Sequence, residues 1–173
     1  MKWLSPKWVS SKWVSKFKAH SKPSQHETPL ADDAIPVLAV IPDRPDRQYL
    51  DEIACRAHWS LEFVPTLDSG KEALRHAVKP VIICDRDLPG CHWRQAIEVL
   101  VASAPGSVVL LASSHDEESL WEEVVRVGGY DVLRKPFDFD RVTHKVHFAW
   151  MYWKFNNRHL TVSKEKVKAP RSS

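Results

Sequence analysis

The stretch VIICDRDLPG, residues 81–90, indicates the fold class more clearly than any other part of the chain. Its apolar residues 81–84 end in Asp85, and the turn pair Pro89-Gly90 follows. A short apolar run bounded by turn residues is typical of a strand that is buried on both faces of a parallel sheet. In an open α/β sheet, ligands bind at the carboxyl ends of the strands. We therefore expect a rigid strand to hold the Asp85 carboxylate at this edge of a sheet.

Strand-like segments alternate with helical segments on both sides of this stretch. Strands are expected at about residues 37–41, 59–64, 81–84, 108–111 and 130–133. Helices are expected at about residues 42–58, 69–79, 91–102, 114–127 and 138–156. This alternation is a (βα)5 pattern. It predicts an α/β fold with a doubly wound, five-stranded parallel sheet and helices on both of its faces.

The composition is ordinary for a globular domain, with 43% hydrophobic and 27% charged residues. A chain of 173 residues has room for one domain with a core, plus tails. The net charge is only +3, and the excess of lysine is concentrated in residues 1–18 and 164–173. The middle of the chain is left mildly acidic, which argues against specific binding of nucleic acid.

The cysteines and the apolar runs limit the compartment. Cys55, Cys84 and Cys91 are odd in number and have no CxxC spacing, which favours a reducing, cytoplasmic setting over a disulfide framework. No run approaches the roughly 18 apolar residues that a membrane helix needs. The N-terminal region has lysines but no continuous apolar stretch, so it does not resemble a secretory signal peptide.

Two further polar side chains follow neighbouring strands of the predicted sheet. Ser113 follows the strand at 108–111, and Lys135 follows the strand at 130–133 and precedes a proline. Because the carboxyl ends of parallel strands share one edge, both side chains should converge with Asp85 on one small anionic pocket. Lys135 could pair with one oxygen of a phosphoryl group on Asp85, while Ser113 hydrogen-bonds another. These groups are suited to forming an acyl phosphate on Asp85.

From residue 35 to about 152, the chain resembles the receiver domain of two-component response regulators. The motifs that carry the resemblance are Asp85-x-x-x-Pro89-Gly90, Ser113 followed by Ser-His-Asp, Gly128-Gly129 leading to Lys135-Pro136-Phe137, and SGKEAL at 69–74. The resemblance implies a flavodoxin-like receiver topology. It implies that Asp85 is the phosphoacceptor, Ser113 the switch hydroxyl and Lys135 the lysine that senses the phosphoryl group. A sensor histidine kinase or phosphotransfer protein of a bacterial phosphorelay would then be the phosphodonor.

The chain departs from the receiver pattern where the metal should bind. Receivers place two acids at the end of the first strand to hold Mg²⁺, and here those positions are Ile41 and Pro42. Mg²⁺ usually takes one or two carboxylates together with phosphate and water. The shifted Asp43, Asp85 and the backbone carbonyl of Asp87 would supply a poor version of this site. We therefore expect Mg²⁺ binding to be weakened or absent, and phosphoryl transfer to be slowed.

The last helix carries two apolar stripes. One stripe, suited to packing on the sheet, consists of Val142, Val146, Ala149, Trp150 and Trp153. The other consists of Phe148, Met151, Tyr152 and Phe155. A helix that is apolar on two sides is usually covered on both. In receivers this helix belongs to a common partner surface. The second stripe therefore predicts contact with a downstream effector or a second copy of the chain. The expected contact face consists of the helix at 114–127, the strand at 130–133 and the helix at 138–156. The N-terminal tryptophans could equally fold back over it.

Three segments are expected along the chain. Residues 1–34 form a Lys/Trp-rich tail and linker that we expect to be disordered, although the same composition suits contact with a membrane surface or an anionic polymer. Residues 35–156 form the receiver-like domain. Residues 157–173 form a basic tail that is too short for an output domain.

Two hypotheses about function remain open from the sequence. In the first, phosphorylation of Asp85 in a phosphorelay switches a partner-binding face, and the only chemistry is self-phosphorylation and dephosphorylation, so the protein is not otherwise an enzyme. In the second, the chain is a pseudo-receiver that binds partners through the same face without phosphorylation. Asp85 would then be a strand-end carboxylate with a role in the turn.

Overall fold

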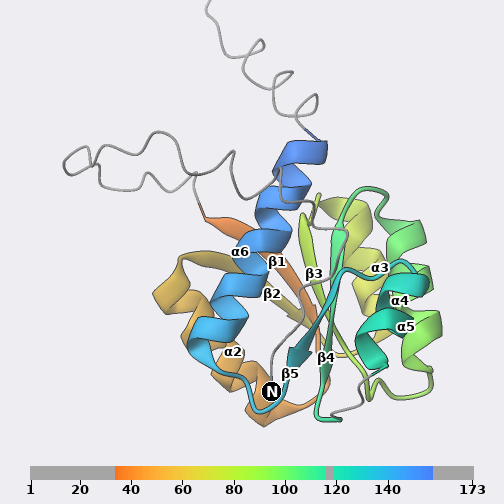
Figure 1. Ribbon diagram of the computed structural model, residues 1–173, viewed down its shortest axis with the longest axis horizontal. Coiled ribbons are helices and arrows are strands. Elements are labelled where there is room, and N and C mark those ends of the chain that lie inside the picture. Colours follow the sequence, from red (N-terminus) through yellow and green to blue (C-terminus); the bar gives the residue numbers. More distant parts are fainter. Residues whose placement is uncertain (1–33, 116–118, 158–173) are drawn as a thin grey trace, which may run out of the picture. The chain divides into compact units, whose positions relative to one another are not determined.

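The computed structural model describes residues 34–115 and 119–157. Five parallel strands form one sheet in the order β2-β1-β3-β4-β5 (Figure 1). The strands are β1 (Ile35–Val40), β2 (Trp59–Val64), β3 (Val81–Asp85), β4 (Val108–Ser113) and β5 (Asp131–Arg134). The predicted α/β fold with a (βα)5 pattern is confirmed, and the strand order is the flavodoxin-like one.

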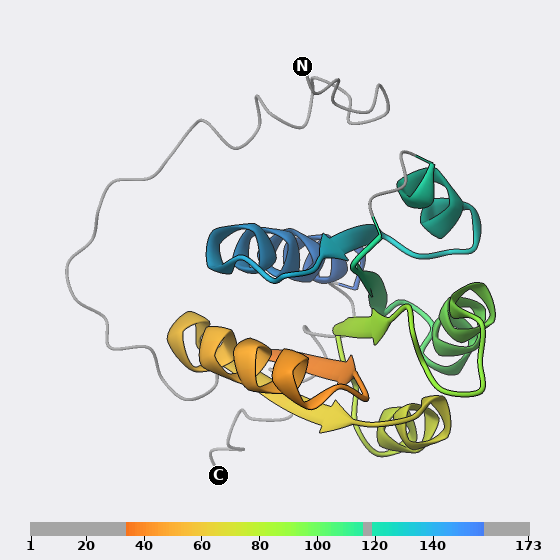
Figure 2. The same ribbon diagram turned by 90° about the horizontal axis from the view of Figure 1, so that it is seen from below.

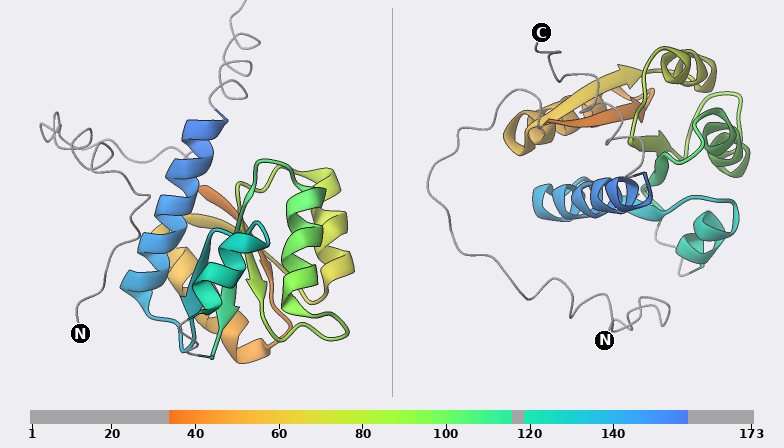
Figure 3. Two further views of the ribbon diagram at one scale, coloured as in Figure 1. Left: turned by 45° about the vertical axis from the view of Figure 1, so that its right-hand side comes forward. Right: turned by 90° about the horizontal axis from the view of Figure 1, so that it is seen from above.

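One helix follows each strand. The helices are α2 (Arg44–Ala57), α3 (Leu67–His76), α4 (Trp93–Ser103), α5 (Leu120–Arg126) and α6 (Phe139–Asn156). Helices α2 and α6 cover one face of the sheet, and α3, α4 and α5 cover the other (Figures 2 and 3). The chain leaves β1 toward β2 on one side and then crosses to β3 on the other side. The carboxyl ends of β1 and β3 therefore form the topological switch point, where ligands bind in folds of this kind.

Two apolar layers hold the helices to the sheet. Alternate residues of each strand face opposite layers because the side-chain period of a strand is two. In β1, Val37 and Ala39 belong to the layer that holds α2 and α6, whereas Leu38 and Val40 belong to the layer that holds α3, α4 and α5. The central strand β3 is buried along its whole length, as its unbroken apolar run predicts. The strand ends are therefore held rigidly between the two layers.

The start of α2 bears directly on the site. Asp43 is the N-cap residue, and its Oδ2 accepts a hydrogen bond from the backbone N–H of Asp46 at 3.4 Å. Pro45 lies in the first turn, where a missing N–H costs nothing. This capping fixes the direction in which the first turn of α2 leaves the switch point.

The predicted helix boundaries differ from the observed ones by at most three residues, except at the start of α5. The sequence favours a helix from Ser114, whereas α5 begins at Leu120. Instead, the Ser113 hydroxyl accepts a hydrogen bond from the backbone N–H of His115 at 3.0 Å. A local bond of this kind gives the backbone an alternative to helix formation. Past the other end of α5, Gly128 adopts a φ of +93°, which favours glycine, and the helix ends at Arg126, one residue before the predicted end at 127.

The two tails lie almost wholly outside the described residues. The predictions for residues 1–34 and 157–173, including contact of the N-terminal tail with a membrane, therefore stay predictions, as do the domain boundaries. Within the described part of the chain, no helix combines the length and the apolar character needed to cross a membrane.

Candidate functional site

Asp85 ends β3 as a buried carboxylate with only 1% of its surface exposed. Its Oδ1 accepts a hydrogen bond from the backbone N–H of Asp87 at 3.0 Å. Its Oδ2 accepts one from Nζ of Lys135 at 2.7 Å. A buried carboxylate without such partners would cost several kcal/mol, so these two contacts make its position tenable. The structure thus holds the buried Asp85 carboxylate in direct contact with the ammonium of Lys135.

Lys135 reaches this carboxylate from the loop after β5. Its backbone N–H donates to the carbonyl of Ser113 at 2.8 Å, which joins the loop to the end of β4. The Lys135–Pro136 peptide bond is cis, and the buried side chain of Phe137 anchors the loop in the core. The sequence prediction that Lys135 and Asp85 meet at one edge thus has a direct counterpart in the structure.

A second carboxylate, Asp46, binds the same ammonium. Its Oδ2 lies 2.6 Å from Nζ of Lys135, so the cation bridges Asp46 of α2 and Asp85 of β3. Burial by itself lowers the pKa of Lys135, but the hydrogen bonds and charges of the two carboxylates outweigh it and raise the pKa above its ordinary value. Lys135 therefore stays charged throughout the physiological pH range.

Sequence reasoning missed Asp46. An acid in the first turn of a helix is already explained by the helix dipole, so it gives no signal of a site. The available signal was its position, one turn beyond Asp43 and close to the end of the first strand. The Asp46 carboxylate reaches Lys135 because α2 begins at the switch point and is packed in this orientation.

Ser113 is the last residue of β4, and only 1% of its surface is exposed. Its hydroxyl bonds the turn that follows, accepting from the N–H of His115 at 3.0 Å and lying 3.4 Å from that residue's carbonyl. The structure thus places Ser113 on the same edge of the sheet as Asp85, with its hydroxyl engaged in the turn. Its predicted role as the switch hydroxyl stays a prediction.

The buried thiol of Cys84 adjoins the site. Burial raises the pKa of Cys84 far above its ordinary value, and the neighbouring charge of Asp85 raises it further. Cys84 therefore remains a neutral thiol, and the negative charge beside Lys135 comes from carboxylates.

The predicted metal ligands line one cavity, but the carboxylates of two of them, Asp43 and Asp85, already accept hydrogen bonds. The cavity, about 460 Å³, is lined by Pro42, Asp43, Asp46, Asp85, Asp87 and Lys135. Ile41, at the first acid position, is fully buried in the apolar layer, and Pro42 has no side-chain ligand atom. Nε of Arg47 donates to the Ile41 carbonyl at 2.5 Å, which places a guanidinium at the end of β1.

This donor set does not fit Mg²⁺, which requires near-octahedral oxygen coordination. The Asp43 carboxylate is engaged as the cap of α2, and both oxygens of Asp85 already accept hydrogen bonds. Residues 34–115 and 119–157 contain no group of three or more His, Cys, Asp or Glu side chains that could hold a metal ion. The cation that lies between Asp46 and Asp85 is the ammonium of Lys135.

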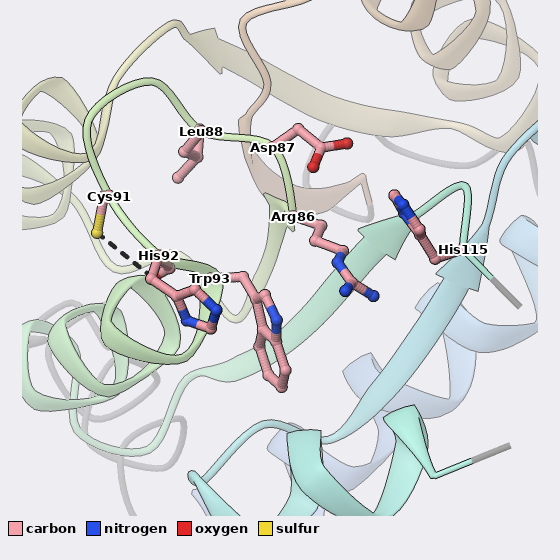
Figure 4. Close-up of a pocket in the computed structure, with 7 residues that line it drawn as sticks. All are labelled: Arg86, Asp87, Leu88, Cys91, His92, Trp93 and His115. Atoms are coloured by element: carbon pink, nitrogen blue, oxygen red, sulfur yellow. Dashed lines mark hydrogen bonds between the residues drawn. The ribbon is translucent and has the colours of Figure 1, made fainter. Parts of the chain in front are cut away.

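A second cavity lies on the other side of the loop after β3. It measures about 340 Å³, and Figure 4 shows the Arg86 side chain extending into the space between Trp93 and His115. The backbone N–H of Arg86 donates to the carbonyl of Ala112 at 2.9 Å, which continues the β3–β4 pairing. Asp87 lines both cavities. At the end of β3, Asp85 therefore lines one cavity, Arg86 lines the other and Asp87 lines both.

The outer side of α6 carries the predicted partner residues. Phe148, Tyr152 and Phe155 are exposed, Met151 is half-buried, and the opposite stripe, which includes Val146 and Trp153, is buried. Tyr152 lies over Tyr130 with ring centroids 5.2 Å apart. Nζ of Lys145 donates to the Asp131 carboxylate and the Val132 carbonyl, at 2.8 and 2.9 Å, and so ties α6 to β5. Three aromatic side chains are thus solvent-exposed on a helix that Lys145 ties to β5.

Comparison with known proteins agrees with this geometry. The family model described as the response regulator receiver domain matches residues 39–147. The chemotaxis protein CheY of Listeria monocytogenes is 26% identical over 91 residues, which are 51% of this chain and 76% of that protein.

Solved receiver structures share the fold. The signal receiver domain of an HD domain-containing protein from Pseudomonas fluorescens is 15% identical, with a TM-score of 0.67 over 78% of this chain and 98% of that one. The beryllofluoride-activated NtrC4 receiver domain dimer is 22% identical, with a TM-score of 0.63 over 68% of this chain and 97% of that one. At 15% and 22% identity, these similarities concern the fold.

Proposed function

This chain belongs to the response regulator receiver domain family, and we propose that it accepts a phosphoryl group on Asp85 and so switches a partner-binding face. The carrying observation is the buried Asp85 carboxylate, bound to Lys135 at 2.7 Å at the switch point of the sheet. A buried carboxylate that an adjacent cation holds in place is suited to nucleophilic attack on phosphorus.

The reaction needs little from the protein beyond position and charge. An Asp85 oxygen forms a bond to phosphorus while the bond from phosphorus to the donor's imidazole nitrogen breaks. That nitrogen keeps the bonding pair, and the product is an acyl phosphate. The ammonium of Lys135 lies where negative charge increases, and this electrostatic contribution dominates in phosphoryl transfer. Receiver domains are generally not enzymes, and the chemistry proposed here is limited to self-phosphorylation and dephosphorylation.

Receiver domains typically bind Mg²⁺, and we propose that binding is weakened or absent in this chain. Ile41 and Pro42 supply no side-chain ligand, so Asp43, Asp85 and the Asp87 carbonyl are the donors left from the predicted set.

The proposed output is the face formed by α5, β5 and α6. A backbone hydrogen bond links the carbonyl of Ser113 to Lys135, so a rearrangement at the end of β4 is transmitted to the loop that leads into α6. The proposed phosphodonor is a sensor histidine kinase or a phosphotransfer protein, and the proposed partner is a downstream effector or a second copy of the chain. The dimer formed by the NtrC4 receiver supports the second of these. The free thiols of the three cysteines support a reducing, cytoplasmic compartment.

Intact-mass measurement after incubation with phosphoramidate, with Mg²⁺ or EDTA, tests the phosphorylation. We expect one phosphoryl increment in the unmodified chain and none in Asp85→Asn. The matched control is Asp87→Asn, because Asp87 lines the same cavity but lies exposed two residues away. If the unmodified chain stays unlabelled in both buffers, the phosphorylation proposal fails and the phosphorylation-independent pseudo-receiver becomes the better hypothesis.

Sedimentation velocity of the phosphorylated chain tests the proposed face. Phe148→Glu places a charge on the exposed stripe of α6, where Phe148 has 56% of its surface exposed. Val78→Glu, at a residue 68% exposed between α3 and β3, is the control for a surface charge elsewhere. Self-association that Phe148→Glu leaves unchanged would contradict a dimer through this face.

A further inference from the structure

We propose that Asp46 is a positioning residue that holds the ammonium of Lys135 beside Asp85, so that this ammonium supports phosphoryl transfer without a divalent ion. The inference rests on the proposed phosphorylation of Asp85 and goes beyond it, because it assigns a role to a carboxylate outside the receiver motif and removes a requirement for metal.

The first step is the geometry of the ammonium. Nζ of Lys135 lies 2.6 Å from Oδ2 of Asp46 and 2.7 Å from Oδ2 of Asp85. The side chain of Lys135 is 14% exposed, that of Asp46 22% and that of Asp85 2%. A lysine side chain carries several rotatable bonds, and one carboxylate alone would leave its end free to swing. Two carboxylates from different elements fix the ammonium between them.

The second step is that Asp46 is itself fixed. Its backbone N–H donates to the capping carboxylate of Asp43, and Pro45 restricts the same turn. The next residue, Arg47, binds the carbonyl of Ile41 through Nε at 2.5 Å. The first turn of α2 is thereby tied to the end of β1, so the Asp46 carboxylate keeps its place beside Lys135.

The third step concerns the charges. Asp46, Asp85 and Lys135 together carry a net charge of −1 when all three are ionised. A divalent ion placed between the two carboxylates would have to displace the ammonium, whose pKa they raise. The positions that would compensate, Ile41 and Pro42, offer no ligand. The ammonium of Lys135 is therefore the cation that this site places to stabilise the negative charge that develops on the phosphoryl group during transfer.

The step balances with a small phosphodonor. Zwitterionic phosphoramidate already carries its proton on nitrogen. An oxygen of Asp85 forms the bond to phosphorus, the P–N bond breaks, and nitrogen leaves as ammonia with the bonding pair. The total charge is unchanged, and the product is an acyl phosphate whose added charge faces Lys135.

The test compares phosphorylation rates of three full-length proteins in EDTA and in Mg²⁺. The variants are Asp46→Asn and the matched control Asp51→Asn, which removes a charge from an exposed position of the same helix, outside the cavity. We expect the unmodified chain and Asp51→Asn to react at about equal rates in both buffers. Asp46→Asn should be about tenfold or more slower, because a displaced catalytic group commonly costs up to about a hundredfold.

A second readout separates positioning from folding. If Asp46 positions the ammonium, Asp46→Asn should lower the maximal rate at saturating phosphoramidate, while the donor concentration that gives half of that rate should change little. Asp51→Asn should change neither quantity. The conservative variant Asp46→Glu, which keeps the charge, should restore part of the rate, and thermal melts establish that each variant is folded.

The outcomes distinguish this inference from the function on which it rests. Labelling that requires Mg²⁺ and loses its response to Mg²⁺ in Asp46→Asn would make Asp46 a metal ligand and overturn the inference while the phosphorylation stands. An Asp46→Asn rate equal to that of the unmodified chain would also overturn the inference about Asp46, while the proposed phosphorylation would stand. An unmodified chain that is not labelled in either buffer would overturn both.

Discussion

The carboxyl ends of β1 and β3 are neighbours in the sheet, and they bear side chains of opposite character. Ile41, just past β1, is fully buried among apolar groups. Asp85, at the end of β3, is buried to nearly the same degree, but both of its oxygens accept hydrogen bonds. An isoleucine needs no partner there, whereas a carboxylate is tolerable only with partners. The structure therefore brings together the predicted carboxylate and lysine, whereas Ile41, at the first predicted acid position, is part of the core.

The largest effect is expected from a substitution that gives the end of β1 a carboxylate, as at the end of β3. Ile41→Asp would bury a carboxylate among apolar groups and should lower the free energy of unfolding by about 3–5 kcal/mol. Urea denaturation measures the change. The control Ile41→Val should cost about 1 kcal/mol, since only one methylene is lost. Equal stability of Ile41→Asp and the unmodified chain would show that the end of β1 is not core.

The second effect tests the partners of Asp85. Lys135→Met removes the ammonium from two carboxylates and should lower the free energy of unfolding by about 2–3 kcal/mol. In a double-mutant cycle with Asp85→Asn, the two changes should cost less together than their sum, because the cation and its partner are lost together. Additive costs would contradict a direct coupling between the two side chains.

A smaller effect is expected at Asp43. Asp43→Ala removes the cap of α2 and should cost about 1 kcal/mol of unfolding free energy, whereas Asp43→Asn keeps a capping oxygen and should be nearly neutral. Thermal denaturation of the two variants measures this. If Asp43→Asn were as damaging as Asp43→Ala, the role of Asp43 would lie in its charge and not in capping.

The smallest effect is expected from alkaline pH. Because the folded-state pKa of Lys135 is raised above 10.5, its ion pairs should contribute fully to stability below that pH and be lost as pH rises through the raised pKa. The stability difference between the unmodified chain and Lys135→Met should thus stay constant from neutral pH to about pH 10 and then shrink. Urea denaturation of both proteins across this range measures the trend. A difference that shrinks below pH 9 would contradict the raised pKa.

The sequence predicts the fold and part of the site because both depend on local patterns. Alternating apolar runs and helical stretches predict the five strands, and residues after strand ends must share one edge in a parallel sheet. Asp85 and Lys135 are found together for that reason, and Ser113 lies on the same edge. The start of α5 could not be predicted, because Ser114 has helix-capping character while the Ser113 hydroxyl bonds the turn instead.

By itself, the sequence determines that this is a receiver-type α/β domain with a strand-end carboxylate and a lysine, and that Ile41 and Pro42 interrupt the acidic pair. Only the tertiary structure shows that Asp46 shares Lys135 with Asp85. The reason is geometric: a strand end is placed by the period of its own strand, whereas a helical side chain reaches a site only through the direction and rotation of the packed helix. Periodicity along the chain carries the first kind of information and not the second.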